Sequence, residues 1–394
     1  MLSVYEGFFS GGARIVHSDV VLGLREGGQH HRVLSIHGEV HREATRQRME
    51  DDACYRKLTA ADVDVTSLGR TFGTGGTDPA VFTGPELADT ARATADADVI
   101  LSLKEQPLAL LAQAGLPRRP VVVCLHRSDP ENQGRALDDL KSAIADGTVA
   151  AAVCCAESTR AAYEAAGVPS ALLHVIPNGV DLIRFRPDAP RRLALRTSLD
   201  IPSTAPVIVF AARYDGMKNV PLFLAAAKAW LASTPDGHVL MCGAGMTTTN
   251  PGLAGDIADT FGDADLSGLH LLGVRHDMET VYAASDVVSL TSSWGEAAPL
   301  CLIEGMMCGA VPVTTDVGDS AAIVAGHGLV TPPDPEAIAG AWQEALANRS
   351  GYAPTLAASR ERFSRTRMIA SYAELIDRVY AAGAALSVTS QEES

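Results

Sequence analysis

Short apolar segments bounded by turn residues alternate along the whole chain with longer segments of helical periodicity. The apolar segments lie at 2–5, 32–36, 63–68, 99–103, 121–125, 150–155, 172–176, 206–212, 238–243, 269–273, 287–290 and 311–315. Apolar runs of this length, without polar alternation, are typical of strands buried on both faces of a parallel sheet. In the first half the intervening pattern predicts helices at about 13–26, 80–95, 106–114, 134–146 and 157–166. We therefore expect an α/β fold with doubly wound sheets.

The turn-rich segment 177–187, PNGVDLIRFRP, separates two such series. Because 394 residues are too many for one ordinary core, two domains are expected, at 1–180 and 181–365. A last helical pattern follows at about 366–384. The polar residues 386–394 are predicted to be a disordered tail.

Charge is spread evenly along the chain, whose net charge is −15. Residues 1–183 carry 17 basic and 24 acidic side chains, and the rest carry 15 and 23. No basic face is concealed in these totals, so nucleic acid and anionic membrane surfaces are not expected as partners. The seven cysteines lack paired metal-binding spacings and indicate reduced thiols. No leader peptide and no apolar run approaching 18 residues is found, which predicts a cytoplasmic protein without stable membrane insertion.

Residues 292–309, SSWGEAAPLCLIEGMMCG, contain two glutamates eight positions apart, Glu296 and Glu304. Pro299 suits the first turn of a helix, and Gly309 suits the position just after its end. The free N–H groups of the first turn, at Leu300 and Cys301, would form an anion site beside Glu296. Two carboxylates flanking an anion site suit a ligand with hydroxyls at both ends and phosphate in the middle, as in a nucleotide sugar.

Two further segments place basic residues at the predicted start of a helix. Arg213 and Lys218 follow a predicted strand, and Gly11 and Gly12 open a helix that contains Arg14. A cation at a helix N-terminus opposes the helix dipole, and a bound diphosphate would reverse the sign of that interaction. The glycines would allow the backbone to approach an anion closely. Exposed surface cations are the alternative interpretation of the basic pair.

The Glu-x7-Glu stretch resembles the motif of retaining GT-B glycosyltransferases, in particular family 4. The resemblance extends through Gly11–Gly12, VIPNGVDLIRFRP at 175–187, FAARYDGMKN around Arg213 and Lys218, and LLGVRHDMETVYAASDVVSLTSSWGE at 271–296. It implies a GT-B fold of two Rossmann-like domains facing across a cleft, the first for the acceptor and the second for the donor. It also implies that the helix at 366–384 packs back on the first domain.

The resemblance implies a role for each matching residue. Arg213 and Lys218 would bind the donor diphosphate and stabilise the leaving group, with the Gly11–Gly12 loop closing on the phosphates. Glu296 would contact the sugar and Glu304 the ribose, while the backbone near Arg275 would meet the nucleobase. His126 follows an apolar strand, where a histidine is more often structural; the resemblance assigns it to sugar hydroxyls near the scissile bond.

The segment 30–41, HHRVLSIHGEVH, is rich in histidine, and His37, Glu39 and His41 would share one face of an extended strand. A metal site is conceivable there, but the spacing is not His-Glu-x-x-His and no later cluster completes it. An acceptor contact by His37 and His41 is the preferred interpretation, and no metal site is predicted.

Together these features predict a metal-independent, retaining glycosyltransferase without a cofactor. Its donor would be a UDP- or GDP-linked sugar and its acceptor a hydroxyl of a small molecule or natural product; the sequence leaves the oligomeric state open. Two alternatives remain. A nucleotide-sugar epimerase shares this fold, and a two-domain sugar-binding protein would bind without catalysis.

Overall fold

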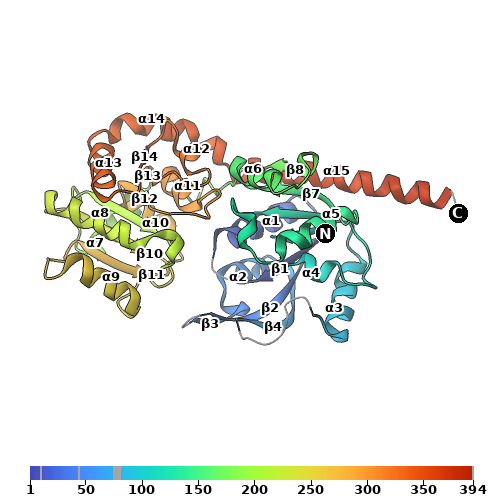
Figure 1. Ribbon diagram of the computed structural model, residues 1–394. Coiled ribbons are helices and arrows are strands. Elements are labelled where there is room, and N and C mark those ends of the chain that lie inside the picture. The colour runs from blue at the N-terminus through green and yellow to red at the C-terminus, as the bar shows by residue number, and fades with distance from the viewer. Residues whose placement is uncertain (9–10, 43–44, 74–80, 393–394) are drawn as a thin grey trace. The chain divides into compact units, whose positions relative to one another are not determined.

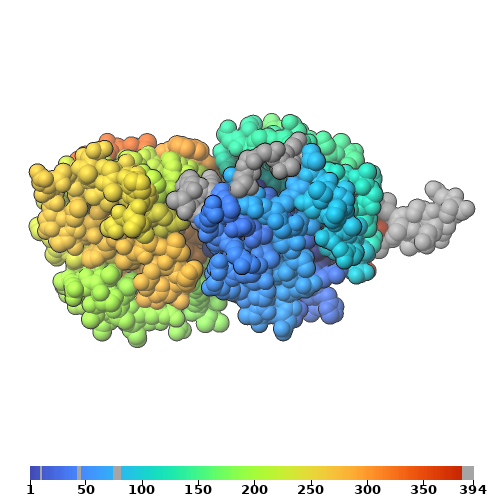
Figure 2. All heavy atoms as spheres, turned by 90° about the horizontal axis from the view of Figure 1, so that it is seen from below, coloured from blue at the N-terminus to red at the C-terminus, as the bar shows by residue number. Residues whose placement is uncertain are grey.

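The apolar segments form the strands of two sheets in the computed structural model, which describes residues 1–8, 11–42, 45–73 and 81–392. The chain divides into two units, Met1–Asn178 with Thr366–Ser394, and Gly179–Arg365. The boundary after Asn178 lies two residues from the one that the sequence predicts. Figure 2 shows the atoms of each unit closely packed, with the first coloured mainly blue to green and the second mainly yellow-green to orange.

The first unit contains an eight-stranded sheet in the order β3-β2-β1-β5-β6-β7-β8, with β4 also pairing with β2. All pairings are parallel except that of β3 with β2. The strands are β1 (Leu2–Gly7), β2 (Arg32–Arg42), β3 (Thr45–Arg48), β4 (Asp64–Phe72), β5 (Ile100–Leu103), β6 (Val121–Leu125), β7 (Val149–Cys154) and β8 (Leu173–Val175).

Helices lie on both sides of this sheet (Figure 1). They are α1 (Gly12–Glu26), α2 (Ala53–Ala60), α3 (Gly84–Ala95), α4 (Leu108–Leu111), α5 (Ala136–Ala145), α6 (Glu157–Ala165) and α15 (Arg365–Glu392), with short 3-10 turns η1 (Met49–Asp51), η2 (Pro130–Asn132) and η3 (Ser170–Leu172). Helix α15 packs on α1, where a Cβ at Gly23 would lie 2.0 Å from Cδ1 of Ile369. Within this unit the Tyr372 hydroxyl also lies 3.8 Å from the Cys124 sulfur of β6.

The structure differs from the sequence-based expectation at the end of α15. A disordered tail is predicted from residue 386, whereas the helix continues to Glu392, and residues 393–394 lie outside the described part of the chain. Neither glycine nor proline interrupts the sequence after Gly383, so nothing in the backbone chemistry ends the helix earlier.

The second unit contains a six-stranded, entirely parallel sheet in the order β11-β10-β9-β12-β13-β14. Its strands are β9 (Val207–Ala211), β10 (His238–Cys242), β11 (Leu269–Gly273), β12 (Val287–Leu290), β13 (Val311–Thr315) and β14 (Leu329–Thr331). Its helices are α7 (Ala189–Ser198), α8 (Val220–Ser233), α9 (Pro251–Phe261), α10 (Met278–Ala284), α11 (Leu300–Met307), α12 (Ser320–Val324), α13 (Pro335–Ala347) and α14 (Arg349–Ser359), with 3-10 turns η4 (Gly216–Lys218) and η5 (Arg360–Phe363).

This order is that of a Rossmann-like sheet, in which the chain starts in the middle, winds to one edge and then returns to wind to the other. In the second unit the reversal lies between β9 and β12, and in the first it lies between β1 and β5. Ligands of open α/β sheets bind outside the carboxyl ends of the strands at such a reversal. We therefore expect a ligand of the second unit to bind at the loops after β9 and β12.

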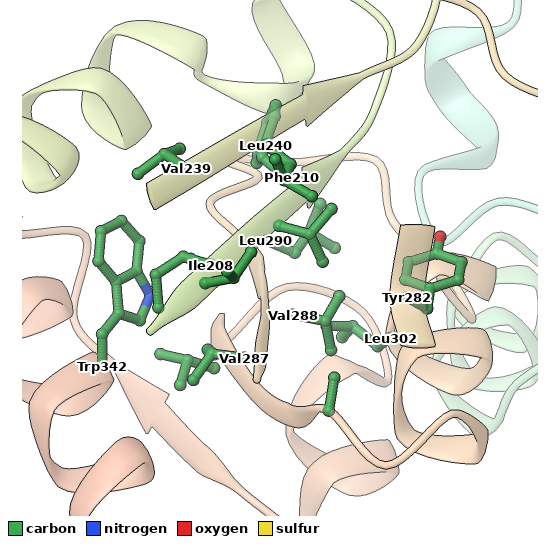
Figure 3. Packing of buried hydrophobic residues seen from close by; sticks show 14 of the residues in the cluster. Ile208, Phe210, Val239, Leu240, Tyr282, Val287, Val288, Leu290, Leu302 and Trp342 are labelled. Atoms are coloured by element: carbon green, nitrogen blue, oxygen red, sulfur yellow. The ribbon is translucent and has the colours of Figure 1, made fainter. Parts of the chain in front are cut away.

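The core of the second unit fixes the strands that carry these loops. Figure 3 shows Ile208 and Val287 beside Trp342, and Val288 beside Leu302 of α11. All five side chains are buried. Helix α11 approaches β12 closely, because a Cβ at Gly305 would lie 2.6 Å from Cγ1 of Val288. The glycine thus seats α11 directly against the strand whose loop leads into it.

Candidate functional site

Lys218 and Glu296 form an ion pair where the loops after β9 and β12 meet. Both side chains are largely buried, at 14% and 8% exposed. The Ser292 hydroxyl donates a second hydrogen bond to Glu296, at 2.6 Å. The alternative interpretation of Lys218 as an exposed surface cation does not fit the structure, because a buried carboxylate 78 positions along the chain holds its ammonium group.

The position of Lys218 also differs from the expected first turn of a helix. It ends the 3-10 turn η4, and Asn219, with φ +50°, caps helix α8 through its side chain at Leu222. Arg213 lies two residues beyond β9 and donates through Nε to Asp215 at 2.9 Å. Asp215 in turn accepts from the backbone N–H of Met217 at 2.9 Å, so this carboxylate positions both the arginine and the lysine turn.

Helix α11 follows the β12 loop and begins one residue later than predicted. Pro299 is its N-cap, with φ −66° and ψ 115°, rather than its first helical residue. Leu300 and Cys301 therefore occupy the first two helical positions, whose N–H groups have no intrahelical partner. The predicted end is confirmed: Gly309 has φ +88°, and Gly309 and Ala310 donate to the carbonyls of Met306 and Gly305. This is the hydrogen-bond pattern of a glycine-terminated helix.

Glu304 lies one turn into α11, half-buried beside Tyr282 of α10. The Tyr282 hydroxyl is buried and hydrogen-bonded to Glu304; burial, followed by this carboxylate, raises the pKa of Tyr282 well above its usual value. The Cys301 thiol lies within electrostatic reach of Lys218, Glu296 and Glu304, and burial raises its pKa to about 12. The charges of these three residues thus all act on the thiol of the second residue of α11.

The residues that hold the loop carrying Glu296 were not predicted from the sequence. They lie at the end of β13 and in the loop after it. The loop after β13 passes so close that a Cβ at Gly318, which has φ +60°, would lie 2.2 Å from the Glu296 carbonyl oxygen. Asp319 donates its N–H to Ala297 at 2.8 Å, and Thr315 donates its hydroxyl to the Ser292 carbonyl at 2.7 Å. A Gly-Asp pair three residues beyond the end of a buried strand was the available signal.

Arg275 follows β11, which is the edge strand of the sheet and is separated from β12 by β10 and β9. It forms two hydrogen bonds with Asp277, at 2.8 and 2.7 Å. An aspartate directly before a helix commonly caps it through its side chain. Asp277 does occupy the N-cap position of α10, but its side chain makes no capping hydrogen bond, because the carboxylate is engaged by Arg275.

In the first unit the predicted glycines lie where the sequence placed them. Gly11 is the N-cap of α1 and Gly12 its first residue, after strand β1. Arg14 forms an ion pair with Asp52, and Asp52 caps α2 through Cys54 at 2.8 Å. The charge of Arg14 is thus compensated within the unit.

The candidate histidines of the first unit lie on β2 and after β6, two strands that β1 and β5 separate in the sheet. His126 directly follows β6, and burial, with the positive charge of Lys104, lowers its pKa to about 3. Its Nε2 atom is buried and finds no hydrogen-bond partner among the described residues. On β2, His37 donates through Nδ1 to the Glu6 carbonyl at 2.6 Å, and the Nε2 atom of His41 lies 2.8 Å from Glu39. The low pKa of His126 means that its imidazole is neutral near pH 7.

Within the described ranges, no three His, Cys, Asp or Glu side chains converge in a way that could hold a metal ion. None of the seven cysteines, all of which lie in the described ranges, forms a disulfide. In that same part of the chain, every helix is too short or too polar to cross a bilayer.

Comparison with known proteins places this arrangement in a family. Residues 10–184 match the family described as Glycosyltransferase Family 4, and residues 205–348 match the one described as Glycosyl transferases group 1. The chain belongs to the group 1 glycosyltransferases of family 4. The match includes most of both units, and the second range contains Arg213, Lys218, Glu296 and Glu304.

Curated relatives of this glycosyltransferase chain include two D-inositol 3-phosphate glycosyltransferases. The one from Saccharomonospora viridis is 34% identical over 162 residues, which is 40% of this chain and 36% of the relative. The one from Thermobispora bispora is 29% identical over 254 residues, or 60% and 58%. The alignments thus span between about a third and three fifths of the relatives' length.

Solved glycosyltransferase structures match over nearly the whole chain. Anabaena HepE in complex with UDP has a TM-score of 0.77 at 19% identity, covering 96% of this chain and 99% of that one. Sucrose-phosphate synthase from Thermosynechococcus elongatus has a TM-score of 0.70 at 19% identity, covering 97% and 99%. The fold is accordingly GT-B, with two Rossmann-like domains.

Proposed function

We propose that the protein transfers a sugar from a nucleoside diphosphate sugar to a hydroxyl group of an acceptor, with retention at the anomeric carbon. The observation that carries this proposal is the arrangement at the topological reversal of the second unit. There Lys218 is paired with Glu296 of the loop that leads into α11, whose first N–H groups have no intrahelical partner, and Arg213, held by Asp215, lies in the β9 loop five residues before Lys218. Fixed cations and amides of this kind stabilise the negative charge that develops on a departing diphosphate.

In the proposed complex the donor lies along the loops of the second unit. Arg213, Lys218 and the N–H groups of Leu300 and Cys301 bind the diphosphate. Glu304 accepts hydrogen bonds from the ribose and Glu296 from the sugar, while the base lies near Arg275. As the sugar leaves, charge grows on the phosphate oxygen that Lys218 and Arg213 contact, so these residues favour the transition state over the ground state.

Residues of the first unit complete the proposed assignment. The Gly11–Gly12 turn closes on the phosphates, and neutral His126 hydrogen-bonds a sugar hydroxyl through its buried Nε2. His37 and His41 contribute to acceptor binding. A front-face reaction, in which the leaving phosphate takes the acceptor proton, accounts for retention without a protein nucleophile.

The donor is proposed to be UDP- or GDP-linked, and the binding of UDP by Anabaena HepE makes UDP sugars the first to test. The acceptor is proposed to be a small soluble molecule. The cationic side chains and amides do the work that a divalent metal does in other transferases, so we propose that the reaction needs no metal.

The test is turnover of nucleotide sugars by the purified 394-residue chain. We expect slow release of nucleoside diphosphate and of free sugar with retained configuration from one of a panel of UDP- and GDP-sugars, with water replacing the acceptor. An epimerised sugar still joined to its nucleotide would instead identify an epimerase. Tight binding without any release would identify a binding protein.

A further inference from the structure

Trp294 is an exposed aromatic residue in the loop that carries Glu296. Of the three tryptophans, Trp230 and Trp342 are fully buried, whereas Trp294 is 53% exposed. It lies in the loop between β12 and α11, two residues before Glu296. A single exposed apolar side chain needs no functional explanation by itself. What distinguishes Trp294 is how its loop is held.

Hydrogen bonds fix this loop on both sides. The N–H of Ser293 donates to the Met217 carbonyl at 2.9 Å, and the Asn219 side chain donates to the Ser293 hydroxyl at 2.9 Å. The carbonyl of Ser292 accepts from Thr315 of β13 at 2.7 Å. The backbone that carries the indole is thus tied to the β9 loop and to the neighbouring strand. An exposed ring on a fixed backbone loses little conformational entropy when a ligand covers it.

One edge of the indole lies next to a glycine of the β9 loop. A Cβ at Gly216 would lie 3.8 Å from Cη2 of Trp294, so the ring edge is in contact distance of a residue that has no side chain to cover it. The Gly216–Trp294 contact is two residues before the Lys218–Glu296 ion pair on both loops. Residues 216–218 form the 3-10 turn η4, which rises about 2 Å per residue, so the two contacts lie roughly 4 Å apart along this loop and belong to the same part of the site.

The order of groups along the β12 loop matches the order of groups in a nucleotide sugar. Trp294 comes first, Glu296 second, and the anion-binding start of α11 at Leu300 third. A ligand whose phosphates lie at Lys218 and Leu300 would extend its sugar past Glu296 toward the indole. The face of an aromatic ring is electron-rich and attracts positively polarised hydrogens. The C–H hydrogens on one face of a pyranose ring have this character.

We propose that Trp294 is a donor-sugar recognition residue, whose indole stacks against the C–H face of the pyranose while Glu296 binds its hydroxyls. The proposal rests on the proposed function, because it needs a nucleotide sugar in this site. It assigns recognition of the sugar, and not of the nucleotide, to Trp294.

Isothermal titration calorimetry separates the two contributions. The ligands are the nucleotide sugar that the wild-type protein turns over and the corresponding nucleoside diphosphate without sugar. For Trp294→Ala we expect the Kd of the nucleotide sugar to rise about 3–10-fold while the Kd of the bare nucleotide stays within about twofold, as for the loss of one aromatic contact. Trp294→Phe, which keeps an aromatic face, should recover most of the affinity.

Leu193→Ala is the matched control, since Leu193 is a similarly exposed apolar residue of α7, at 59%. It should leave both affinities unchanged. An unchanged affinity of Trp294→Ala for the nucleotide sugar, or an equal loss for both ligands, would overturn the assignment to the sugar. If the wild-type protein turns over no nucleotide sugar at all, the proposed function itself fails, which is a separate result.

Discussion

Lys218 is bound to its site through a carboxylate that the proposed reaction also uses. The largely buried Glu296 accepts from both Lys218 and Ser292 in the ligand-free protein. Removing one partner of a buried ion pair leaves the other charge uncompensated, and this costs about 1–3 kcal/mol or more. Lys218 therefore contributes to stability, which the sequence alone gave no reason to expect.

We predict that Lys218→Ala and Arg213→Ala each lower kcat by about 100-fold or more, because both cations stabilise charge that grows as the sugar departs. Steady-state kinetics of donor turnover measure this. A change in KM with unchanged kcat would mean that the residue binds only the ground-state diphosphate.

The control for Lys218→Ala is Lys228→Ala in the same unit, since Lys228 is exposed and donates to the Thr260 carbonyl at 2.7 Å. Its kcat should match that of the wild type. Thermal unfolding should show a lower Tm for Lys218→Ala than for Lys228→Ala, because only the former leaves a buried carboxylate without its cation. A fully folded Lys218→Ala with wild-type kcat would exclude Lys218 from the mechanism.

At Glu304 the prediction concerns binding. Glu304→Ala should weaken the binding of the bare nucleotide and of the nucleotide sugar by about 1–3 kcal/mol, as for the loss of charge-assisted hydrogen bonds to ribose hydroxyls. Calorimetry gives the value directly. Tyr282→Phe is the matched control, because it removes the Tyr282–Glu304 hydrogen bond and keeps the carboxylate. Affinity lost in Tyr282→Phe but kept in Glu304→Ala would contradict the ribose assignment.

At the scale of elements, strands β6, β11 and β12 coincide with the apolar segments predicted at 121–125, 269–273 and 287–290. The strands that were not predicted lack this signal. The sequence of β3 is TRQR, all polar, and it pairs antiparallel at a sheet edge, while β14 has only three residues. Helix α2 was not predicted either, although Asp52 is a favourable N-cap residue and its side chain does cap this helix.

The candidate site was predictable only in part, for a physical reason. Residues after buried strands reach the same edge of a sheet, so sequence position placed Arg213, Lys218 and Glu296 near one another. Which side chains pair with one another depends on tertiary packing. The contact of Lys218 with Glu296 joins two loops that are far apart in sequence, and the contact of Gly318 with the Glu296 backbone joins two further loops. No local pattern reports such contacts.

The loop between β13 and α12 supports Glu296 and gives a prediction at this scale. Gly318→Ala places a Cβ against the Glu296 carbonyl, at 2.2 Å in the present backbone, so the loop that carries Glu296 must move. Displacement of a reacting group by about 1 Å can lower a rate about 100-fold, and we expect kcat/KM for the donor to fall by at least about tenfold.

Gly326→Ala is the control for this substitution. Gly326 also has a left-handed φ, +76°, but a Cβ there meets no atom within 4 Å. Both variants lose about 1–2 kcal/mol of stability from backbone strain, and only Gly318→Ala should lose activity. Equal kcat/KM in the two variants would show that Gly318 is needed for the fold alone.

For the whole molecule, the absence of a metal requirement is a prediction that activity can test. The positive groups proposed to hold the diphosphate are side chains and backbone amides of the second unit, so donor turnover should be unchanged in excess EDTA. The rate is compared before and after dialysis against the chelator. A loss of activity that Mg²⁺ or Mn²⁺ restores would contradict the proposed mechanism.

The stability of the first unit should depend on pH through Glu105, which follows β5. Its carboxyl is buried, accepts from Gln133 at 2.9 Å and is hydrogen-bonded to Tyr163 of α6. Burial raises the pKa of Glu105 to about 7, although the nearby positive charges of Lys104 and Arg127 oppose the shift. Between about pH 4.5 and pH 7, the Glu105 carboxyl of the folded unit therefore keeps a proton that it has already lost in the unfolded chain.

Because the folded state binds the extra proton, its contribution to stability is fully present below about pH 4.5 and is lost as the pH rises through about 7. From pH 5 to pH 8 we expect the free energy of unfolding of the first unit to fall by about 2–3 kcal/mol through this group. Glu105→Gln, which cannot ionise, should be free of this fall. Hydrogen exchange of amides in β5 and β6 measures it, with β9 and β12 of the second unit as an internal reference. A wild-type profile that matches that of Glu105→Gln across this range would show that Glu105 is already ionised in the folded protein.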